Sequence, residues 1–351
     1  MKKFIYGVNG IAAVFLVISL VLPYLPPNSY PIISLLSLIV SPLIFFNTFF
    51  FLYWLLMGKA KMLLSATVLL MAYFFFNPFL QFSSEGNANS VESTLKVMSY
   101  NVRLFNAYQD NSPQNVPETI SKIIGATKPD VLCIQEYYRD QNAYFLEYPF
   151  QYKHFRSTKN KKGVLKENYL GHAILSKYPI INSGAFDFND TYNNSLYVDI
   201  VKSQDTIRVY NLHLESMGVA PKVSFLQKSD TKKLLGRISS GFVKQQSQIE
   251  EILEHKESSH YPVLVSGDFN NTPFSYVYRE MTNEMKDSYL ERGSGLGTTY
   301  LFDWYPMRID YILASDTFKI LKFETVKTTF SDHYPIMATV GWSSKFSDKK
   351  D

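Results

Sequence analysis

The sequence predicts an α/β protein, a layered sandwich with two sheets inside, preceded by three transmembrane helices. Three long segments without charge lie within the first 82 residues, and a small, polar segment follows at 83–94. From residue 95 to residue 342, short β-rich runs alternate with helical patterns. A chain of 351 residues allows roughly two units at about 150 residues per domain. We therefore expect a membrane unit and a separate α/β unit.

Composition excludes several classes of protein. With 46% hydrophobic and 19% charged residues, the chain has material for a core and is not a disordered or low-complexity sequence. Its single cysteine, Cys133, excludes an intramolecular disulfide and any CxxC redox or zinc site. Lys2, Lys3, Lys59, Lys61 and Glu85 are the charged residues of the first 86; the remainder has 31 basic and 30 acidic residues, about +1 in total. That balance gives no broad positive surface for nucleic acid.

The three predicted membrane spans are residues 4–22, 32–57 and 62–82. Each is long enough, at a rise of 1.5 Å per residue, to cross a hydrocarbon core of roughly 30 Å. None contains Asp, Glu, Lys or Arg, so they indicate an anchor rather than an ion pathway. A cleaved signal peptide is the alternative for the first span, but two further apolar runs follow it and no small-residue cleavage site does. A buried soluble domain is a second alternative, disfavoured by the aromatic run at 45–54.

Lysine placement predicts the orientation. Lys2 and Lys3 precede the first span, and Lys59 and Lys61 separate the second span from the third, which is the same side of a three-span bundle. Cytoplasmic loops retain Lys and Arg, so we expect a cytoplasmic N-terminus. The chain after residue 82 would then lie on the extracytoplasmic face.

The second unit begins after the polar segment 83–94, whose composition is typical of a linker. Helical periodicity is visible at 117–126 and most clearly at 234–255, where apolar residues recur near 3.6-residue spacing. The expected strands, each bounded by turn residues, are 96–100, 131–135, 172–175, 196–201, 207–213, 263–266, 308–313 and 336–340.

Polar side chains stand at or just after the ends of these strands. They are Asn101, Glu136, His213, Asp268, Asn270, Asp310, Asp332 and His333. Each alone has an ordinary structural explanation, such as a turn cap, a solvated strand end, an Asx turn or a core histidine. Together they indicate a site, because loops after strand ends are where a rigid scaffold presents reactive groups.

These residue types suit metal-assisted attack of water on a phosphate ester. The carboxylates of Glu136 and Asp332 and the amide oxygen of Asn101 are hard ligands of the kind that Mg²⁺ or Mn²⁺ prefers. Asp268, next to Asn270, is the candidate that polarises the attacking water.

Two histidines complete the predicted chemistry. His213 and His333 are available for electrostatic or acid–base roles at the phosphate. Asp310 is placed to hold one ring nitrogen of His333 and to fix its tautomer.

Seven strings in order resemble the motif set of the endonuclease/exonuclease/phosphatase superfamily, which has the deoxyribonuclease I-like fold. They are MSYNVR (98–103), IQE (134–136), GHAILSKYPI (171–180), NLHL (211–214), GDFNNTP (267–273), RIDYI (308–312) and SDHYPI (331–336). The resemblance covers about 95–342, and with three spans ahead of it the chain is similar to membrane-anchored bacterial members. We therefore place it in a bacterial inner or cell membrane, with a periplasmic catalytic domain.

The resemblance implies a four-layered α/β sandwich, with two central mixed sheets flanked by helices, and a divalent-metal phosphoesterase that uses Mg²⁺, or Mn²⁺. It implies metal-site roles for Asn101, Glu136 and Asp332. The residues implied to be catalytic are His213 beside the phosphate, Asp268 at the water, Asn270 on the phosphate, and the pair Asp310 and His333 at the transition state. The expected organisation is an anchor at 1–82, a linker at 83–94, a catalytic domain at 95–342 and a charged tail at 343–351.

Substrate assignment stays open at this stage. Tethering to a bilayer through three helices favours a lipid or small phosphodiester at the extracytoplasmic face. An endonuclease or exonuclease acting on DNA or RNA is the alternative, for which Lys159, Lys161 and Lys162 would supply backbone contacts. A non-catalytic binding protein is a further alternative. No protein partner is inferred, and no role is assigned to Glu167 or Tyr169.

Overall fold

The computed structural model describes residues 2–76, 80–107, 115–138, 145–159, 165–220 and 222–343, and the side chains of all of these except 157–159 and 165–169. Two mixed six-stranded sheets form its centre. The first has the order β10 (Met285–Asp287), β14 (Asp310–Ser315), β9 (Val263–Asp268), β8 (Asp205–His213), β7 (Asn194–Lys202), β6 (Ile180–Asp187). The second has the order β15 (Lys319–Thr325), β16 (Ile336–Trp342), β2 (Ser93–Asn101), β3 (Val131–Tyr138), β5 (Leu165–Ser176), β4 (Phe150–Lys159).

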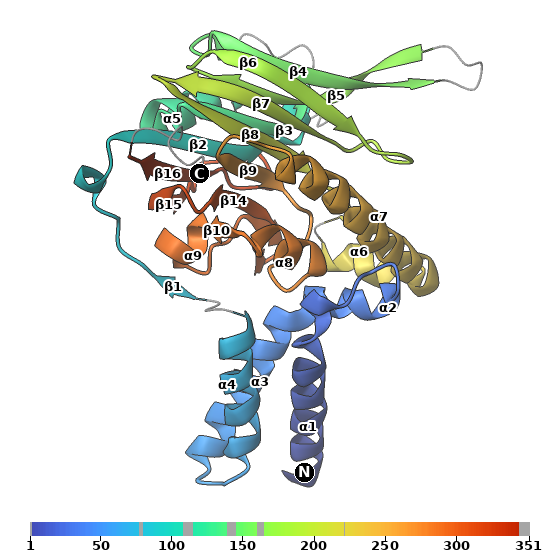
Figure 1. Cartoon of the computed structure of the whole chain (residues 1–351). Coiled ribbons are helices and arrows are strands. Elements are labelled where there is room, and N and C mark those ends of the chain that lie inside the picture. Colours follow the sequence, from blue (N-terminus) through green and yellow to red (C-terminus); the bar gives the residue numbers. More distant parts are fainter. Residues whose placement is uncertain are drawn as a thin grey trace.

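The two sheets pack face to face because their strands alternate apolar side chains toward a shared core. Buried residues of both sheets, such as Val97 and Cys133 from one and Val198 and Val209 from the other, form that core. Helix α5 (Val116–Thr127) covers the outer face of the second sheet, and α7 (Thr231–Glu257) with α8 (Tyr276–Thr282) covers that of the first (Figure 1). The predicted four-layered α/β sandwich is confirmed.

The two main helices begin where the sequence supplies caps. The side chain of Asn115 accepts a hydrogen bond from the amide of Glu118 at the start of α5, and Asp230 accepts one from Lys233 at the start of α7. Smaller elements complete the sandwich: α6 (Val223–Lys228), α9 (Ser288–Arg292), η3 (Ala88–Ser90), η4 (Arg103–Asn106), and the strand pairs β1 (Gln81–Phe82) with β11 (Ser294–Gly295) and β12 (Tyr300–Phe302) with β13 (Tyr305–Met307).

All eight expected strands lie in the two sheets, whereas β4, β6, β10 and β15 were not predicted. The segment 83–94 lies along the second sheet: the amide of Gly86 donates to the carbonyl of Leu321, and that of Glu92 donates to the carbonyl of Trp342.

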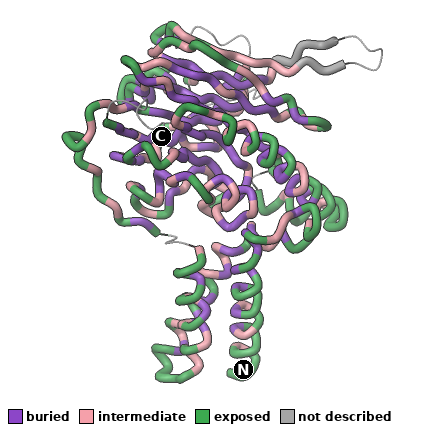
Figure 2. The backbone as a smooth tube through the Cα atoms, viewed as in Figure 1, coloured by how far each residue is buried: buried purple, intermediate pink, exposed green. Residues whose placement is uncertain are grey.

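An N-terminal stem of helices projects from the sandwich (Figure 1). Its elements are α1 (Lys2–Ser19), η1 (Leu22–Tyr24), α2 (Pro31–Ser34), η2 (Leu35–Ile39), α3 (Val40–Leu56) and α4 (Met62–Phe76). Two helical segments are long and apolar enough to cross a membrane, Lys2–Tyr24 with 23 residues and Pro31–Leu56 with 26. Many residues along these helices are exposed (Figure 2). Phe4 and Phe49 are large apolar side chains among the exposed ones.

The prediction of a third span at 62–82 is not supported at its stated length. Helix α4 has 15 residues, about 22 Å at 1.5 Å per residue, which is shorter than the hydrocarbon core of a bilayer. Gln81 and Phe82 are not helical, because they pair in strand β1 with Gly295 and Ser294. Residues 77–79 lie outside the described part of the chain. The structure therefore has two clear candidate spans and one shorter apolar helix.

A buried polar network joins the three long helices of the stem. The amide of Asn9 on α1 donates to Ser65 on α4 over 2.7 Å, and the indole of Trp54 on α3 donates to Asn9 over 3.1 Å. Asn47 on α3 donates to the carbonyls of Leu43 and Ala12. Hydrogen bonds of this kind hold helices together where the surroundings are apolar.

The stem also packs onto the sandwich. Phe274 belongs to an apolar cluster with Leu16, Val40 and Val68 of the stem, and its ring meets that of Phe76 edge to face. The hydroxyl of Thr272 donates to the carbonyl of Ser37 over 2.9 Å. The amide of Asn28 donates to the side chain of Gln246 on α7 over 2.8 Å. These contacts attach the helices to the loop that follows strand β9 and to helix α7.

Gly267, the penultimate residue of β9, is predicted to tolerate no side chain. It has a φ of 144°, and a Cβ atom there would lie 2.0 Å from the carbonyl oxygen of Leu212 on β8. We expect Gly267→Ala to lower the free energy of unfolding by more than about 3 kcal/mol, because backbone rather than a flexible side chain must move. Thermal unfolding of the full chain in nanodiscs measures this.

Gly125 is the matched control for that substitution. It lies in α5 with open space around its Cβ position, so Gly125→Ala should leave stability unchanged or raise it by up to about 1 kcal/mol. Equal unfolding temperatures for the two variants would contradict the packing described for β8 and β9.

Candidate active site

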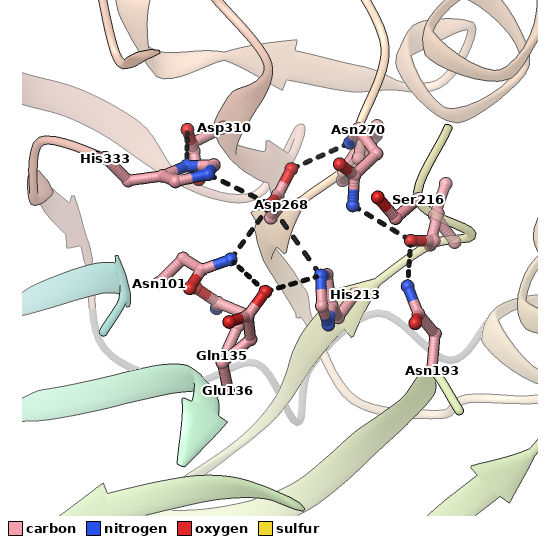
Figure 3. Close-up of polar contacts among 12 residues, drawn as sticks. Asn101, Gln135, Glu136, Asn193, His213, Ser216, Asp268, Asn270, Asp310 and His333 are labelled. Atoms are coloured by element: carbon pink, nitrogen blue, oxygen red, sulfur yellow. Dashed lines mark hydrogen bonds and ion pairs between the residues drawn. The ribbon is translucent and has the colours of Figure 1, made fainter. Parts of the chain in front are cut away.

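The site lies where the two sheets bring their strand ends together (Figure 3). Each sheet contains one parallel pair, β2 with β3 and β8 with β9, so neighbouring strands of a pair end at the same edge. Asn101 is opposite Gln135 in one sheet, and Asp268 is opposite both His213 and Asp310 in the other. The register of these strand pairs brings residues that are far apart in the sequence to one edge of the sandwich.

A buried hydrogen-bond network joins the two sheets beneath the site. The side chain of Gln135 donates to Asn211 over 2.6 Å and to Ser99 over 3.1 Å. Asn211 in turn donates to the carbonyls of Ile134 and Ala173. Because these groups are fully buried, they hold the strand ends at a fixed spacing.

Asp268 is the centre of the site. Its Oδ1 accepts a hydrogen bond from the backbone amide of Asn270 over 2.8 Å, and its Oδ2 accepts one from the side chain of Asn101 over 3.1 Å. Burial, with the neighbouring carboxylate of Asp310, raises the pKa of Asp268 above the usual range of an aspartate.

His333 lies between two carboxylates. Its Nδ1 is 3.0 Å from Asp310 Oδ2, and its Nε2 is 3.6 Å from Asp268 Oδ2. Burial alone would lower the pKa of His333, but Asp310 and Asp268 outweigh it and raise that pKa. The ring of Tyr300 lies 4.7 Å from the imidazole, centroid to centroid, so the histidine is confined on that side as well.

Glu136 is turned toward the site by a bulge in β3. The pairing of β3 with β5 shifts between Ile134 and Tyr137, and Glu136 takes a φ of 53°, which is costly for a residue with a side chain. Its Oε1 accepts a hydrogen bond from Asn101 over 3.3 Å. Burial raises the pKa of Glu136. The strained backbone conformation at Glu136 thus directs its carboxylate away from the sheet and toward the site.

His213 faces the two carboxylates through Nε2, which is 3.8 Å from Asp268 and 3.9 Å from Glu136. Its Nδ1 is 2.9 Å from Nε2 of His172 on β5. Burial, with the nearby His172 and His333, lowers the pKa of His213 well below its usual value. His213 is therefore held as a neutral imidazole.

His172 is a positioning residue that the sequence did not single out, although it lies within the GHAILSKYPI string. It is fully buried and is held by Asn194 at its other ring nitrogen. The available signal was a histidine directly before the apolar residues 173–175 of the predicted strand.

Asn270 and Asp332 also lie at the site. The side-chain amide of Asn270 donates to the carbonyl of Leu214 over 3.0 Å, so its amide oxygen is the part turned away from that bond. The carboxylate of Asp332 lies 3.5 Å from Nε of Arg103. Arg103 begins η4, a left-handed turn in which all four residues have positive φ. No sequence pattern predicted this turn.

A cavity of about 480 Å³ opens above these groups. Its polar lining consists of Asn101, Arg103, Glu136, Ser216, Asp268, Asn270, Asp332 and His333. The rest of its wall is largely apolar.

All eight predicted site residues lie at this site. Six of them line the cavity, and His213 and Asp310 lie behind it, next to Asp268 and His333. Lys161 and Lys162 lie outside the described residues, as do the side chains of Lys159, Glu167 and Tyr169.

The donor set fits a hard divalent cation. Glu136, Asp268 and Asp332 present carboxylates to one cavity, and burial raises the pKa values of the first two, so the protein groups around them compensate their negative charge only in part. In addition, Asp268, Asp310 and His333 each offer a ligand atom within 4.8 Å of one another. Asn101, Glu136 and Asp332 remain the predicted metal-site residues.

Comparison with known proteins agrees with this geometry. A sandwich of this kind, with its site at the common edge of two sheets, belongs to a class of metal-dependent hydrolases that act on phosphate esters. Residues 98–333 match the model described as Endonuclease/Exonuclease/phosphatase family, which is more than half of the chain, and the protein belongs to that family. Members of the family are metal-dependent phosphoesterases and nucleases. Residues 2–79 match a model described as a domain of unknown function.

Solved structures show the same fold. An endonuclease/exonuclease/phosphatase from Beutenbergia cavernae is 19% identical with a TM-score of 0.54, covering 72% of each chain. One from Bacteroides vulgatus is 17% identical with a TM-score of 0.52, covering 72% of this chain and 100% of its own. A family protein from Bacteroides thetaiotaomicron is 18% identical with a TM-score of 0.51, covering 71% and 98%. No curated protein matches the sequence.

The buried histidine pair is predicted to make stability depend on pH. Burial lowers the pKa of His172 to about 4, whereas an unfolded histidine titrates near 6.5. Between those values the unfolded chain binds more protons, so stability is complete above about pH 6.5 and falls as the pH drops toward 4. A shift of this size is worth on the order of 3 kcal/mol.

Unfolding of the full chain at pH 7.5 and pH 5 measures this dependence. We expect His172→Gln to reduce the loss of stability between the two pH values, whereas the exposed-site control His260→Gln should keep it. An unchanged pH dependence in His172→Gln would show that His172 is not buried as a neutral imidazole.

Proposed function

We propose that the protein hydrolyses a phosphodiester, or a phosphomonoester, and that its substrate is a lipid or a small phosphodiester. The reaction uses Mg²⁺ or Mn²⁺ and takes place at the extracytoplasmic face of a bacterial inner or cell membrane. The observation that carries the proposal is the cavity in which the carboxylates of Glu136, Asp268 and Asp332 and the imidazole of His333 meet an apolar wall. The apolar stem supports the membrane location. We propose the organisation given above, with an anchor at 1–82, a segment at 83–94, a catalytic domain at 95–342 and a tail at 343–351.

In the proposed reaction, a water oxygen forms a bond to phosphorus and the bond from phosphorus to the ester oxygen breaks. The carboxylate of Asp268 takes a proton from the water and releases it to solvent afterwards, and the departing oxygen takes up a proton from solvent, so that one water molecule is divided between the two products. A divalent cation held by Asn101, Glu136 and Asp332 would supply charge neutralisation for the phosphate oxygens.

The other side chains act through their charge and hydrogen bonds. His333, kept cationic between Asp310 and Asp268, is placed to stabilise the negative charge that builds up on the phosphoryl oxygens. His213 presents its Nε2 to the same region as an acceptor, because its Nδ1–H donates to Nε2 of His172, whose own Nδ1–H donates to Asn194. Asn270 positions Asp268 through its backbone amide and lines the cavity for contact with the phosphate.

Removing the carboxylate of Asp268 is predicted to abolish turnover. We expect Asp268→Asn to lower kcat by roughly 10²–10⁴-fold, the usual contribution of a general base. The full chain in nanodiscs with Mg²⁺, assayed on bis(p-nitrophenyl) phosphate and on a phosphodiester lipid, measures this. Chelation with EDTA should abolish hydrolysis, and added Mg²⁺ should restore it.

The exposed-site variant Asp316→Asn serves as the control and should retain full activity. Supercoiled plasmid added in a parallel arm tests the alternative: nicking by the wild type but not by Asp268→Asn would favour a nuclease. Binding of these substrates with no hydrolysis of any would instead favour a non-catalytic binding protein.

The proposed orientation can be tested by cysteine labelling, because the single native thiol is inaccessible to the reagent. Cys133 is fully buried, so a membrane-impermeant maleimide should not label the wild type. We expect Glu257→Cys, on the surface of the sandwich, to be labelled in intact spheroplasts. Lys59→Cys, in the turn between α3 and α4, should be labelled only after lysis. The reverse pattern would refute an extracytoplasmic catalytic domain.

A further inference from the structure

The apolar wall of the active-site cavity has a contributor outside the sandwich. Leu38, Ile39 and Pro42, from η2 and the start of α3, line the same cavity as Asp268 and Glu136. The wall is completed by Met217, Val219, Leu226 and Ile238 from the segment 214–238, and by Phe302, Met307 and Ile309 near the β12–β13 pair. Residues of the N-terminal stem thus line the same cavity as the carboxylates of the sandwich.

This wall is fixed in place by packing. Leu38 and Leu35 pack against a buried cluster formed by Met217, Ile238 and Phe242. The carbonyl of Ser37 accepts a hydrogen bond from Thr272, four residues after Asp268. The position of η2 is therefore set relative to the carboxylates by contacts on both of its sides, and the wall is part of the folded site.

The wall also continues into the exposed apolar surface of the stem. Ile39 is 42% exposed although it lines the cavity, and the helix that follows it exposes Phe46 and Phe49 by 59% and 61%. The segment Pro31–Leu56 is one of the two that are long and apolar enough to cross a bilayer. Ile39 therefore belongs both to the cavity wall and to the segment that is apolar enough to cross a bilayer.

An apolar wall does not bind a phosphoryl group, which is charged and requires polar partners. The carboxylates, amides and imidazoles that recognise phosphate lie at one side of the cavity, and about 480 Å³ is a volume typical of sites that enclose a small organic ligand. An apolar surface next to a charged one suits an amphiphile, because removing each methylene of a hydrocarbon tail from water contributes to binding. A nucleic-acid strand would instead use a path of phosphate-binding cations and stacking rings; the cavity offers Arg103 and the rings of Tyr300, Phe302 and Tyr305, but most of its other wall residues are aliphatic.

We infer that Leu38, Ile39 and Pro42 form, with Val219 and Leu226, an apolar subsite for the hydrocarbon tail of a membrane-resident phosphate ester. This inference rests on the proposed function, and it makes the stem a specificity-determining part of the active site. The tail lies along η2 while the phosphoryl group lies among the carboxylates. Substrates that differ only in tail length are then distinguished by the stem.

The test compares methyl and dodecyl p-nitrophenyl phosphate as substrates of the full chain in nanodiscs. We expect kcat/KM to be at least about tenfold higher for the dodecyl ester. Ile39→Asp, which places a charge in the subsite, should reduce that ratio about tenfold. The matched control is Ile32→Asp, in the same segment and more exposed, but outside the cavity; it should keep the ratio of the wild type.

Two outcomes would overturn the inference while leaving the proposed function standing: hydrolysis of both esters with equal kcat/KM, or an equal change of the ratio in the two variants. Failure to hydrolyse either ester or bis(p-nitrophenyl) phosphate would instead count against the proposed function.

A measurement without turnover tests the subsite separately. A dodecyl phosphate with a diazirine at the end of its tail is photolysed with the same nanodiscs, and the labelled peptides are mapped by mass spectrometry. We expect label in 31–42 and 214–238, lost from both in Ile39→Asp and retained in Ile32→Asp. Label confined to the outer faces of α1, α3 and α4 would show that the tail lies only in the bilayer, and would overturn the inference.

Discussion

The burial of two carboxylates side by side is the constraint on which the rest of the site depends. Asp268 and Asp310 are opposite one another on adjacent strands, and both are almost completely removed from solvent. Burying a charge costs several kcal/mol unless partners compensate for it. His333 bonds to Asp310 and lies close to Asp268, and Asn101 and Asn270 donate hydrogen bonds to Asp268. Each partner comes from a different segment, so the site requires the whole sandwich.

The backbone meets this constraint with departures from regular geometry. Gly267 lets β9 approach β8 closely, a bulge turns Glu136 out of β3, and the left-handed turn at Arg103 brings a cation to Asp332. Conformations of this kind cost free energy and persist only where the surroundings determine them. Their concentration around one cavity is physical support for a functional site that is independent of any family resemblance.

Much of this was accessible from the sequence, for definite reasons. Strands such as 207–213 and 263–266 have a strong local signal, and the polar side chains at their ends predicted that His213 and Asp268 belong to one site. The pairing of Gln81 and Phe82 with β11 was not predicted, because it depends on residues more than 200 positions away and the local sequence reads as the end of an apolar helix. The support of His213 by His172 was missed because it crosses from one sheet to the other.

The relation of the stem to the site shows what a division of the chain into anchor and enzyme leaves out. The loop after β9 carries Asn270 at the cavity, Thr272 bonded to Ser37 and Phe274 inside the apolar cluster of the stem, all within five residues. A chain that began at residue 95 would keep the catalytic motifs but would expose Phe274 and lose one wall of the cavity. Composition distinguishes the stem from the sandwich, because the stem exposes its apolar residues and the sandwich buries them. Packing nevertheless joins the two, because the short loop after β9 contributes both to the cavity and to the apolar cluster of the stem.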